Sequence, residues 1–327
     1  MPNRKTPGQF QSIMGNLIKS FLDGKRSCGY QYHEGERILR QLDRFLHGKG
    51  LATQELPRPI LKQWLSKRMH ESATTHSCRI SCVRQFARYL SQLGYSAYVP
   101  PPLEGSLSRS QFAPRILTRE EMCRLLARVD QLAPTARSPY RHLIMPEILR
   151  LLYGGGFRVG ELLKLRVRDV DLTQGVLTVR QGKFRKDRLV PLALSLVSRL
   201  EKYAKHFSER PPDAIFFPSP SGQSYGLRSI YGLFRQLLIQ AGIPHGGRGK
   251  GPRVHDLRHT FAVHTVKRWY QEGADLDVKL PLLSIYLGHR DLSGTQKYVH
   301  VTAELFPEIT TRVNLDFGQV IPRRTTP

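Results

Sequence analysis

Apolar residues recur at helical spacing through the first hundred positions of the chain. Four stripes place their apolar residues three or four positions apart, which puts each set on one face of a helix; they span residues 10–22, 38–46, 60–65 and 80–93. Four amphipathic helices joined by short connections predict a small all-helical unit over residues 1–98, with the stripes as its core.

The helical periodicity stops at residues 99–115, which contain four prolines and several Gly and Ser residues. Clusters of these residue types are typical of loops. We therefore predict a linker over 99–115, a second domain over 116–310 and a C-terminal tail over 311–327.

The second domain mixes helical and strand patterns. Thr118 and Glu121 have the spacing of a capping box at a helix start, and a strongly apolar helix is predicted over 142–153. The β-forming runs 176–179 and 188–192 flank a charged segment and predict a β-hairpin. Helical patterns return at 194–205, 229–240 and 256–270. The expected fold class is mostly α, with a small antiparallel β-sheet in this α+β domain and an all-α four-helix domain before it.

The chain carries a large positive charge. Its 327 residues include 51 Lys and Arg but only 26 Asp and Glu, so the formal net charge is +25, and the isoelectric point is about 10.4. Both halves share the excess, which favours two basic surfaces that bind one nucleic acid; a soluble basic protein with no specific partner is the alternative. In the first domain the candidates for phosphate contact are Lys62, Lys67, Arg68, Arg79, Arg84 and Arg88.

Other features narrow the class of protein. No apolar run reaches about 18 residues, so no transmembrane helix is expected, and the first ten residues lack the apolar segment of a signal peptide. The chain has four cysteines, Cys28, Cys78, Cys82 and Cys123. They are too few and too scattered for a disulfide scaffold. Cys78 and Cys82 lack a second pair of ligands at the spacing that a zinc site needs. We expect reduced thiols, no metal, no cofactor and a cytoplasmic, nucleoid-associated protein.

Two segments of the second domain combine glycine with basic residues. Arg158 and Glu161 belong to a Gly-x-Arg-x-x-Glu pattern that directly follows the apolar helix. Lys183 follows a glycine at the tip of the predicted hairpin, and Lys186 lies three residues further along the same tip.

Two later segments combine histidine with an arginine or a tyrosine. His255 and Arg258 form a His-x-x-Arg pattern, and a Leu-Gly-His pattern ends at His289, nine residues before Tyr298. Each pattern alone is weak evidence. All of them in this order, over residues 117–306, closely resemble the tyrosine recombinase/integrase family, and the four-helix half resembles that family's core-binding domain.

The resemblance implies how these residues act on a phosphodiester. Arg158 and Arg258 would bind its non-bridging oxygens through forked donors, because in-line attack develops negative charge there. Tyr298 would be the nucleophile, and its ordinary pKa of about 10 means that it needs help to lose its proton. The product would be a 3′-phosphotyrosyl link and a free 5′-hydroxyl, which religate without ATP or a metal.

The resemblance also implies supporting roles. His255 corresponds to the general base or proton relay, and His289 to a group that hydrogen-bonds the scissile phosphate. Lys183 corresponds to the general acid for the leaving 5′ oxygen, with Lys186 as its rival. The neighbouring residues are expected to support the site without reacting: Glu161 orients it, and His259 and His300 are structural.

The function that the resemblance implies is site-specific recombination of double-stranded DNA, of the integrase or transposon type. Four protomers would act on two paired DNA sites, with an accessory DNA-bending protein or a second recombinase as a further partner, and residues 305–327 would be available to dock onto a neighbour. The connection from Arg258 to His289 is longer than the family usually has, and we expect a surface loop at 269–277. The alternatives are a type IB topoisomerase-like relaxing enzyme and a non-catalytic DNA-binding protein.

Overall fold

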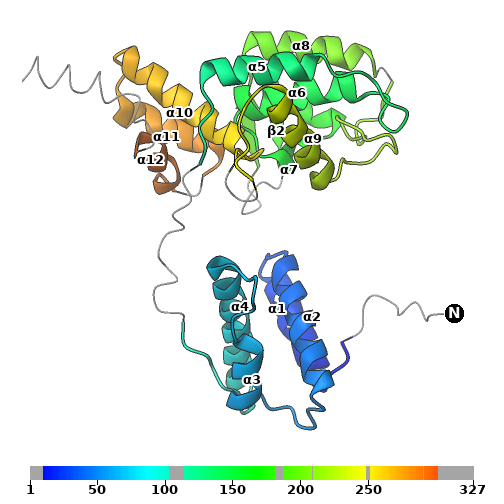
Figure 1. The fold of residues 1–327 in the computed structure, drawn as a ribbon, viewed down its shortest axis with the longest axis vertical. Helices are drawn as coiled ribbons and strands as arrows, with labels where there is room; N and C mark the ends of the chain where they lie inside the picture. The colour runs from blue at the N-terminus through cyan, green and yellow to red at the C-terminus, as the bar shows by residue number, and fades with distance from the viewer. Residues whose placement is uncertain are drawn as a thin grey trace, which may run out of the picture. The chain divides into compact units, whose positions relative to one another are not determined.

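The computed structural model describes residues 10–102, 114–180, 187–207, 209–247, 251–289 and 291–300. The chain divides into two compact units, residues 1–112 and 113–327 (Figure 1). Lys183 and Lys186 lie outside the described residues, as does the predicted tail. Among the helices that the structure describes, none has the length and apolar character needed to cross a membrane.

The described part of the first unit, residues 10–102, contains four helices, one at each apolar stripe. They are α1 (Gly15–Ser27), α2 (His33–Gly48), α3 (Arg58–Leu65) and α4 (Ala73–Gln92). The stripes form its core, in which Ile18, Leu39, Leu42 and Phe86 are fully buried. The predicted all-α unit is confirmed, because burial of each apolar face against the others stabilises helices that would be marginal alone.

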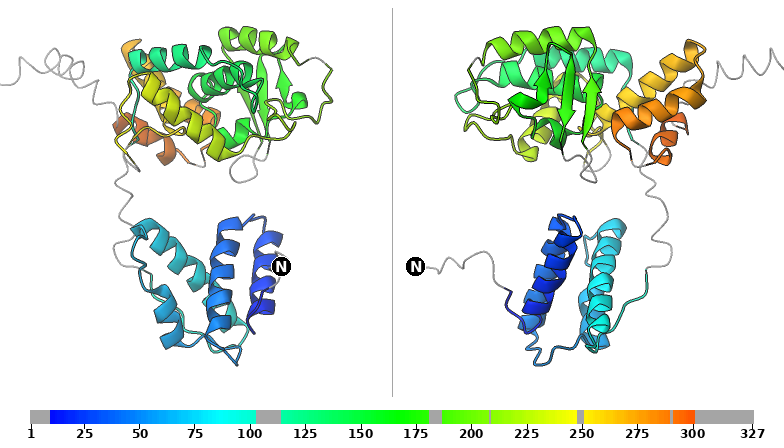
Figure 2. Two further views of the ribbon diagram at one scale, coloured as in Figure 1. Left: turned by 45° about the vertical axis from the view of Figure 1, so that its right-hand side comes forward. Right: turned by 180° about the vertical axis from the view of Figure 1, so that it is seen from behind.

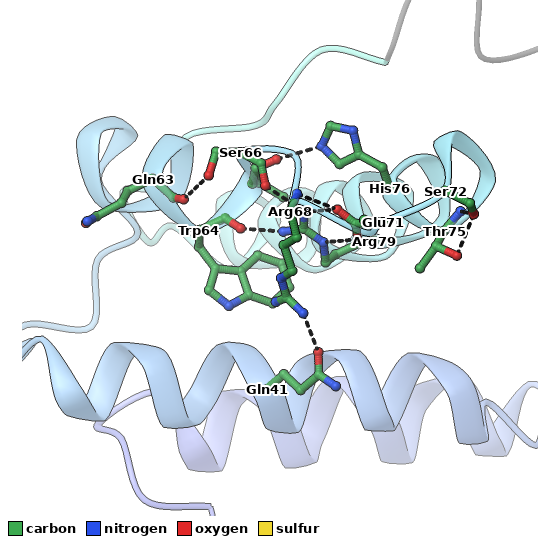
Figure 3. Close-up of polar contacts among 11 residues, drawn as sticks. Gln41, Gln63, Trp64, Ser66, Arg68, Glu71, Ser72, Thr75, His76 and Arg79 are labelled. Carbon is green, nitrogen blue, oxygen red and sulfur yellow. Dashed lines mark hydrogen bonds and ion pairs between the residues drawn. The ribbon is translucent and has the colours of Figure 1, made fainter.

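The loop between α3 and α4 is organised by a buried ion pair (Figure 3). The side chains of Arg79 and Glu71 are 2% and 5% exposed, and Arg79 Nε and Nη2 donate to the Glu71 carboxylate at 2.9 and 2.7 Å. Arg79 also donates to the carbonyl oxygens of Trp64 and Ser66 and lies 4.8 Å from the centre of the Trp64 ring. The interpretation of Arg79 as a phosphate contact is therefore wrong, because protein groups already occupy its donors.

Replacing Arg79 tests this ion pair. We expect Arg79→Ala to lower the free energy of unfolding by about 3–5 kcal/mol, because it leaves the Glu71 carboxylate buried without its partner. Urea unfolding followed by Trp64 fluorescence, in a Trp269→Phe background that removes the other of the two tryptophans, measures the change. The exposed Arg88 on α4 provides the control, and equal losses in the Arg79→Ala and Arg88→Ala variants would contradict the assignment.

The residues of the second unit that the structure describes form helices and one small sheet. Its helices are α5 (Arg119–Asp130), α6 (Arg141–Gly154), α7 (Val159–Leu162), α8 (Leu194–Lys205), α9 (Leu227–Gln240), α10 (Asp256–Gln271), α11 (Leu276–Leu287) and α12 (Ser293–His300), with a 3₁₀ turn at Val167–Asp169. The apolar helix α6 packs against α5, α8 and α10 in the core. The capping box of α5 is present: Thr118 Oγ1 accepts from the Glu121 N–H, and Glu121 Oε2 accepts from the Thr118 N–H.

The sheet contains three antiparallel strands in the order β1 (Val170–Asp171), β2 (Val176–Val179) and β3 (Arg188–Pro191). β2 and β3 form the predicted hairpin, in a register that pairs Val176 with Pro191 and Val179 with Arg188. The sheet is visible in the right-hand view of Figure 2. The mostly α fold with a small antiparallel sheet is confirmed.

The prediction of a surface loop over residues 269–277 is largely wrong. α10 continues to Gln271, and α11 begins at Leu276 after only four intervening residues. Asp275 ends this short connection by accepting the backbone N–H groups of Asp277 and Val278, at 2.9 and 3.3 Å. A carboxylate that accepts free N–H groups at a helix start stabilises the helix there, so most of the extra length lies within helices.

Candidate active site

The motif segments meet where α7, β3, α10, α11 and α12 come together. α10, α11 and α12 pack around a small apolar cluster that includes Val263, Leu283 and Tyr298, and Figure 2 shows these helices side by side at one end of the second unit. α7 and β3 contact the end of α11 through hydrogen bonds from Arg158 and Arg188.

Arg158 directly precedes α7, and its side chain is 22% exposed. Its Nη1 donates to Glu161 Oε1 at 2.8 Å, and its Nη2 donates to the carbonyl oxygen of Gly288 at 3.2 Å. Its backbone N–H donates to Glu161 Oε2 at 2.9 Å. One carboxylate therefore holds both the backbone and the guanidinium of Arg158, while part of the side chain stays accessible.

Glu161 also binds a second arginine. Arg188, the first residue of β3, donates from Nη1 to Oε1 at 2.9 Å and from Nη2 to Oε2 at 2.8 Å, and its Nε donates to the Tyr286 carbonyl oxygen at 3.1 Å. Burial raises the pKa of Glu161, but the hydrogen bonds and charge of Arg188, together with the hydrogen bonds of Arg158, outweigh burial and lower this pKa to about 2. The carboxylate is therefore ionised at neutral pH.

Arg258 lies in the first turn of α10 and is 1% exposed. Its Nη1 donates to the carbonyl oxygen of Gly156 at 2.7 Å, and its Nη2 donates to that of Leu287 at 2.5 Å. Burial, aided by the charge of Arg158, lowers the pKa of Arg258 to about 10, so this guanidinium is still charged at neutral pH. The two arginines are thus anchored on the carbonyls of consecutive residues, Leu287 and Gly288.

Tyr298 lies on α12 and is 3% exposed. Its hydroxyl is 3.1 Å from Nδ1 of His259, and its ring stacks on that of His289 with centroids 6.1 Å apart. Burial raises the pKa of Tyr298, and Arg258, by its charge and hydrogen bonding, and Arg158, by its charge, offset part of this rise. The phenol is therefore neutral at rest, beside cations that stabilise its ionised form.

The histidines surround the tyrosine and the second arginine. His255 directly precedes α10, with its ring centre 4.8 Å from that of His259. Burial lowers the pKa of His255 to about 3, and the charges of His259 and Arg258 add to the effect. Nδ1 of His289 is 2.7 Å from Thr295 Oγ1, which fixes the ring beside Tyr298. Within the described ranges, no three His, Cys, Asp or Glu side chains gather closely enough to bind a metal ion.

Comparison with known proteins identifies the family. Residues 115–304 match the model of the phage integrase family. A putative integrase/recombinase of Sinorhizobium fredii, y4rE, is 32% identical over 94% of this chain and 98% of its own length. The chain belongs to the phage integrase family. Tyrosine recombinase XerD of Shewanella oneidensis is 31% identical to this integrase, over 83% of the chain and 86% of XerD. The resemblance drawn from the motifs is confirmed, and the integrase is a tyrosine-type recombinase.

Solved structures share the fold of this integrase. The site-specific recombinase XerH, bound to a palindromic difH substrate, aligns with a TM-score of 0.64 and 19% identity, over 90% of this chain and 83% of XerH. A lambda integrase dimer bound to a core site aligns with a TM-score of 0.59 and 16% identity, over 86% of this chain and 94% of the other.

The integrase fold brings together the predicted site residues that the structure describes. Lys183 and its rival Lys186 fall in the masked tip 181–186, and the side chain of His300 is likewise outside the described residues. Sequence reasoning missed Arg188, which it treated only as part of a strand, and it assigned His259 a structural role. The i, i+4 spacing of His255 and His259 on one helix face was the available signal for His259.

The low pKa of His255 predicts a pH dependence of stability. The unfolded chain protonates this histidine at about pH 6.5, whereas the folded chain keeps it neutral down to about pH 3. Stability is therefore lost as the pH falls below 6.5, and the loss reaches about 2 kcal/mol at pH 5. Urea unfolding followed by Trp269 fluorescence, in a Trp64→Phe background, should show this extra loss in the parent but not in His255→Gln. Parallel pH dependences in the two proteins would refute the assignment.

Proposed function

We propose that this integrase is a site-specific recombinase that cuts and rejoins duplex DNA through Tyr298. The observation that carries the proposal is the convergence of Arg158 and Arg258 on the adjacent carbonyls of Leu287 and Gly288, with Tyr298 beside Arg258. Two fixed guanidiniums this close match the two non-bridging oxygens of one phosphodiester.

In the proposed cleavage step, the Tyr298 oxygen attacks phosphorus in line with the leaving 5′ oxygen. The new bond joins phosphorus to the tyrosine, the bond to the 5′ oxygen breaks, and the 3′ side stays attached as a phosphotyrosine. Arg158 and Arg258 stabilise the charge that develops on the non-bridging oxygens, and His289 donates a hydrogen bond to the phosphate.

Protons leave and enter at opposite ends of the reacting group. The tyrosine proton passes first to His259, whose Nδ1 is 3.1 Å from the hydroxyl, and His255, with its ring centre 4.8 Å from that of His259, extends the relay. Lys183, or Lys186 in its place, protonates the leaving 5′ oxygen as general acid. Religation reverses these transfers, so the cycle needs neither a metal nor a cofactor.

The proposed substrate is double-stranded DNA held by both basic units. In the first unit Lys67, Arg68 and Arg88 are exposed, whereas Arg79 is not available. Strand exchange between two DNA sites requires four protomers, so we propose a homotetramer on paired sites, with residues 305–327 as the connection to a neighbour. An accessory DNA-bending protein or a second recombinase completes the assembly, in the cytoplasm with the nucleoid.

DNA specificity separates this proposal from the topoisomerase and binding alternatives. The integrase should form a covalent adduct only on fragments that carry its site, and should exchange strands only when two sites are present. Equal adducts on unrelated fragments, with relaxation of any supercoiled plasmid, would favour a type IB topoisomerase. Tight binding to the site without an adduct would favour a non-catalytic DNA-binding protein.

A further inference from the structure

Arg188 is a largely buried arginine in the active-site region, and the proposed reaction steps assign it no role. Its side chain is 12% exposed, beside a Glu161 side chain that is 8% exposed. Its Nε and both terminal nitrogens already have protein partners, two on Glu161 and one on Tyr286. These donors face protein groups, so Arg188 is poorly placed to bind the DNA phosphate itself.

The contacts of Arg188 converge on the two groups that hold Arg158. Glu161 receives both the backbone N–H and Nη1 of Arg158, and Gly288 receives its Nη2. Gly288 has φ +65°, and a Cβ there would lie 3.0 Å from Cδ of Arg188. The absence of a side chain at this position lets Arg188 pack directly against the turn whose carbonyl anchors Arg158.

The charges around Glu161 indicate what Arg188 does. Glu161 with Arg158 alone would be a closed ion pair, in which the carboxylate draws the whole guanidinium toward itself. Arg188 engages both carboxylate oxygens in a bidentate pair, which is the strongest arginine–carboxylate geometry. Arg158 then keeps a single side-chain hydrogen bond to Glu161, and its Nη2 stays at the Gly288 carbonyl beside the other arginine.

We propose that Arg188 is a positioning residue for Arg158: by neutralising Glu161 it keeps the Arg158 guanidinium directed at the scissile phosphate. The inference rests on the proposed DNA cleavage by Tyr298. Loss of Arg188 should lower the rate of cleavage at saturating protein, because Arg158 is then misplaced. It should leave the affinity for DNA unchanged, because Arg188 itself does not contact the DNA.

The first test is single-turnover cleavage of a nicked suicide substrate by the full-length protein. For Arg188→Met we expect a rate about 10- to 100-fold below the parent, the scale on which small misplacements of a catalytic group act. Arg188→Lys should fall between them, because lysine keeps the charge but lacks the fork. Arg199→Met is the control. Arg199 on α8 also forms an ion pair with a buried carboxylate, that of Glu147 on α6. Loss of Arg199 should leave the cleavage rate unchanged.

A double variant tests whether Arg188 acts through Glu161. If it does, Arg188→Met should cost much less in a Glu161→Gln background than in the parent, because the charge that Arg188 neutralises is gone. Full additivity of the two rate effects would overturn the proposal. Equal rate losses in Arg188→Met and Arg199→Met would also overturn it, since both would then report only lost stability.

A substrate with sulfur in place of the leaving 5′ oxygen distinguishes a rate effect that acts through Arg158 from one that acts through the hairpin lysine. A thiolate leaves without protonation, so this substrate bypasses the general acid but still needs the arginines. The Arg188→Met defect should persist on it, and restoration of the parent rate would overturn the proposal by assigning Arg188 to the lysine. Absence of any adduct from the parent protein on its own site would instead refute Tyr298 cleavage, so the two failures are distinguishable.

Discussion

Tyr298→Phe is expected to abolish the covalent protein–DNA adduct while the protein stays folded and binds its site. Removing the hydroxyl removes the nucleophile, and comparable losses lower other enzymes' rates on the order of 10⁶-fold. The ring remains in the cluster of α10, α11 and α12, so the variant loses only the hydrogen bonds of the hydroxyl with His259 and Arg258, at a cost of about 1–3 kcal/mol. Denaturing gels of reactions on a suicide substrate measure the adduct, and gel shifts measure binding.

The control for this variant is a tyrosine that is buried without facing the arginines. Tyr203 donates to the Phe216 carbonyl oxygen in the core of the second unit, so Tyr203→Phe should keep the adduct at a comparable cost in stability. An adduct of undiminished yield in Tyr298→Phe would show that another residue attacks the DNA.

Arg258→Lys is expected to lower the cleavage rate roughly 10²- to 10³-fold, the scale for loss of one preorganised donor to developing charge. Lysine keeps a positive charge but cannot donate at once to the carbonyls of Gly156 and Leu287 and to a phosphate. The substitution therefore affects both the anchoring of the α11 end and the binding of the phosphate. Single-turnover cleavage at saturating protein measures the rate.

Arg268 on the same helix is the matched control. Its side chain is 58% exposed and 3.8 Å from Glu272, so Arg268→Lys should leave both cleavage and unfolding unchanged. If Arg258→Lys retained the parent's cleavage rate with its fold intact, Arg258 would be only a structural anchor and not part of the phosphate clamp.

Regular patterns in the sequence predicted most of the local structure. The four apolar stripes correspond to α1, α2, α3 and α4, and the capping-box spacing of Thr118 and Glu121 predicted the start of α5. The hairpin of β2 and β3 was predicted from two β-forming runs on either side of a charged tip, whereas its register is known only from the structure. These features depend on neighbours within a few residues, so periodicity and turn chemistry are sufficient to find them.

Features that depend on distant partners could not be predicted in this way. In the sequence Arg79 resembles a surface cation, and only the structure shows that Glu71 and the carbonyl oxygens of Trp64 and Ser66, at the end of α3, surround it. Arg188 meets Glu161 across 27 positions, and His259 meets Tyr298 across 39. α11 carries apolar residues on its exposed as well as its buried sides, so it shows no amphipathic stripe by which its start could be recognised.

The central claim is that Tyr298 becomes covalently joined to the 3′ phosphate of the cut strand. The most direct measurement is to trap the adduct on a nicked suicide substrate, digest both protein and DNA, and locate the attached nucleotide by mass spectrometry. The account predicts the nucleotide on the peptide that contains Tyr298, linked through its phenolic oxygen and absent from Tyr298→Phe. A nucleotide attached to any other residue, or an adduct through a 5′ phosphate, would contradict it.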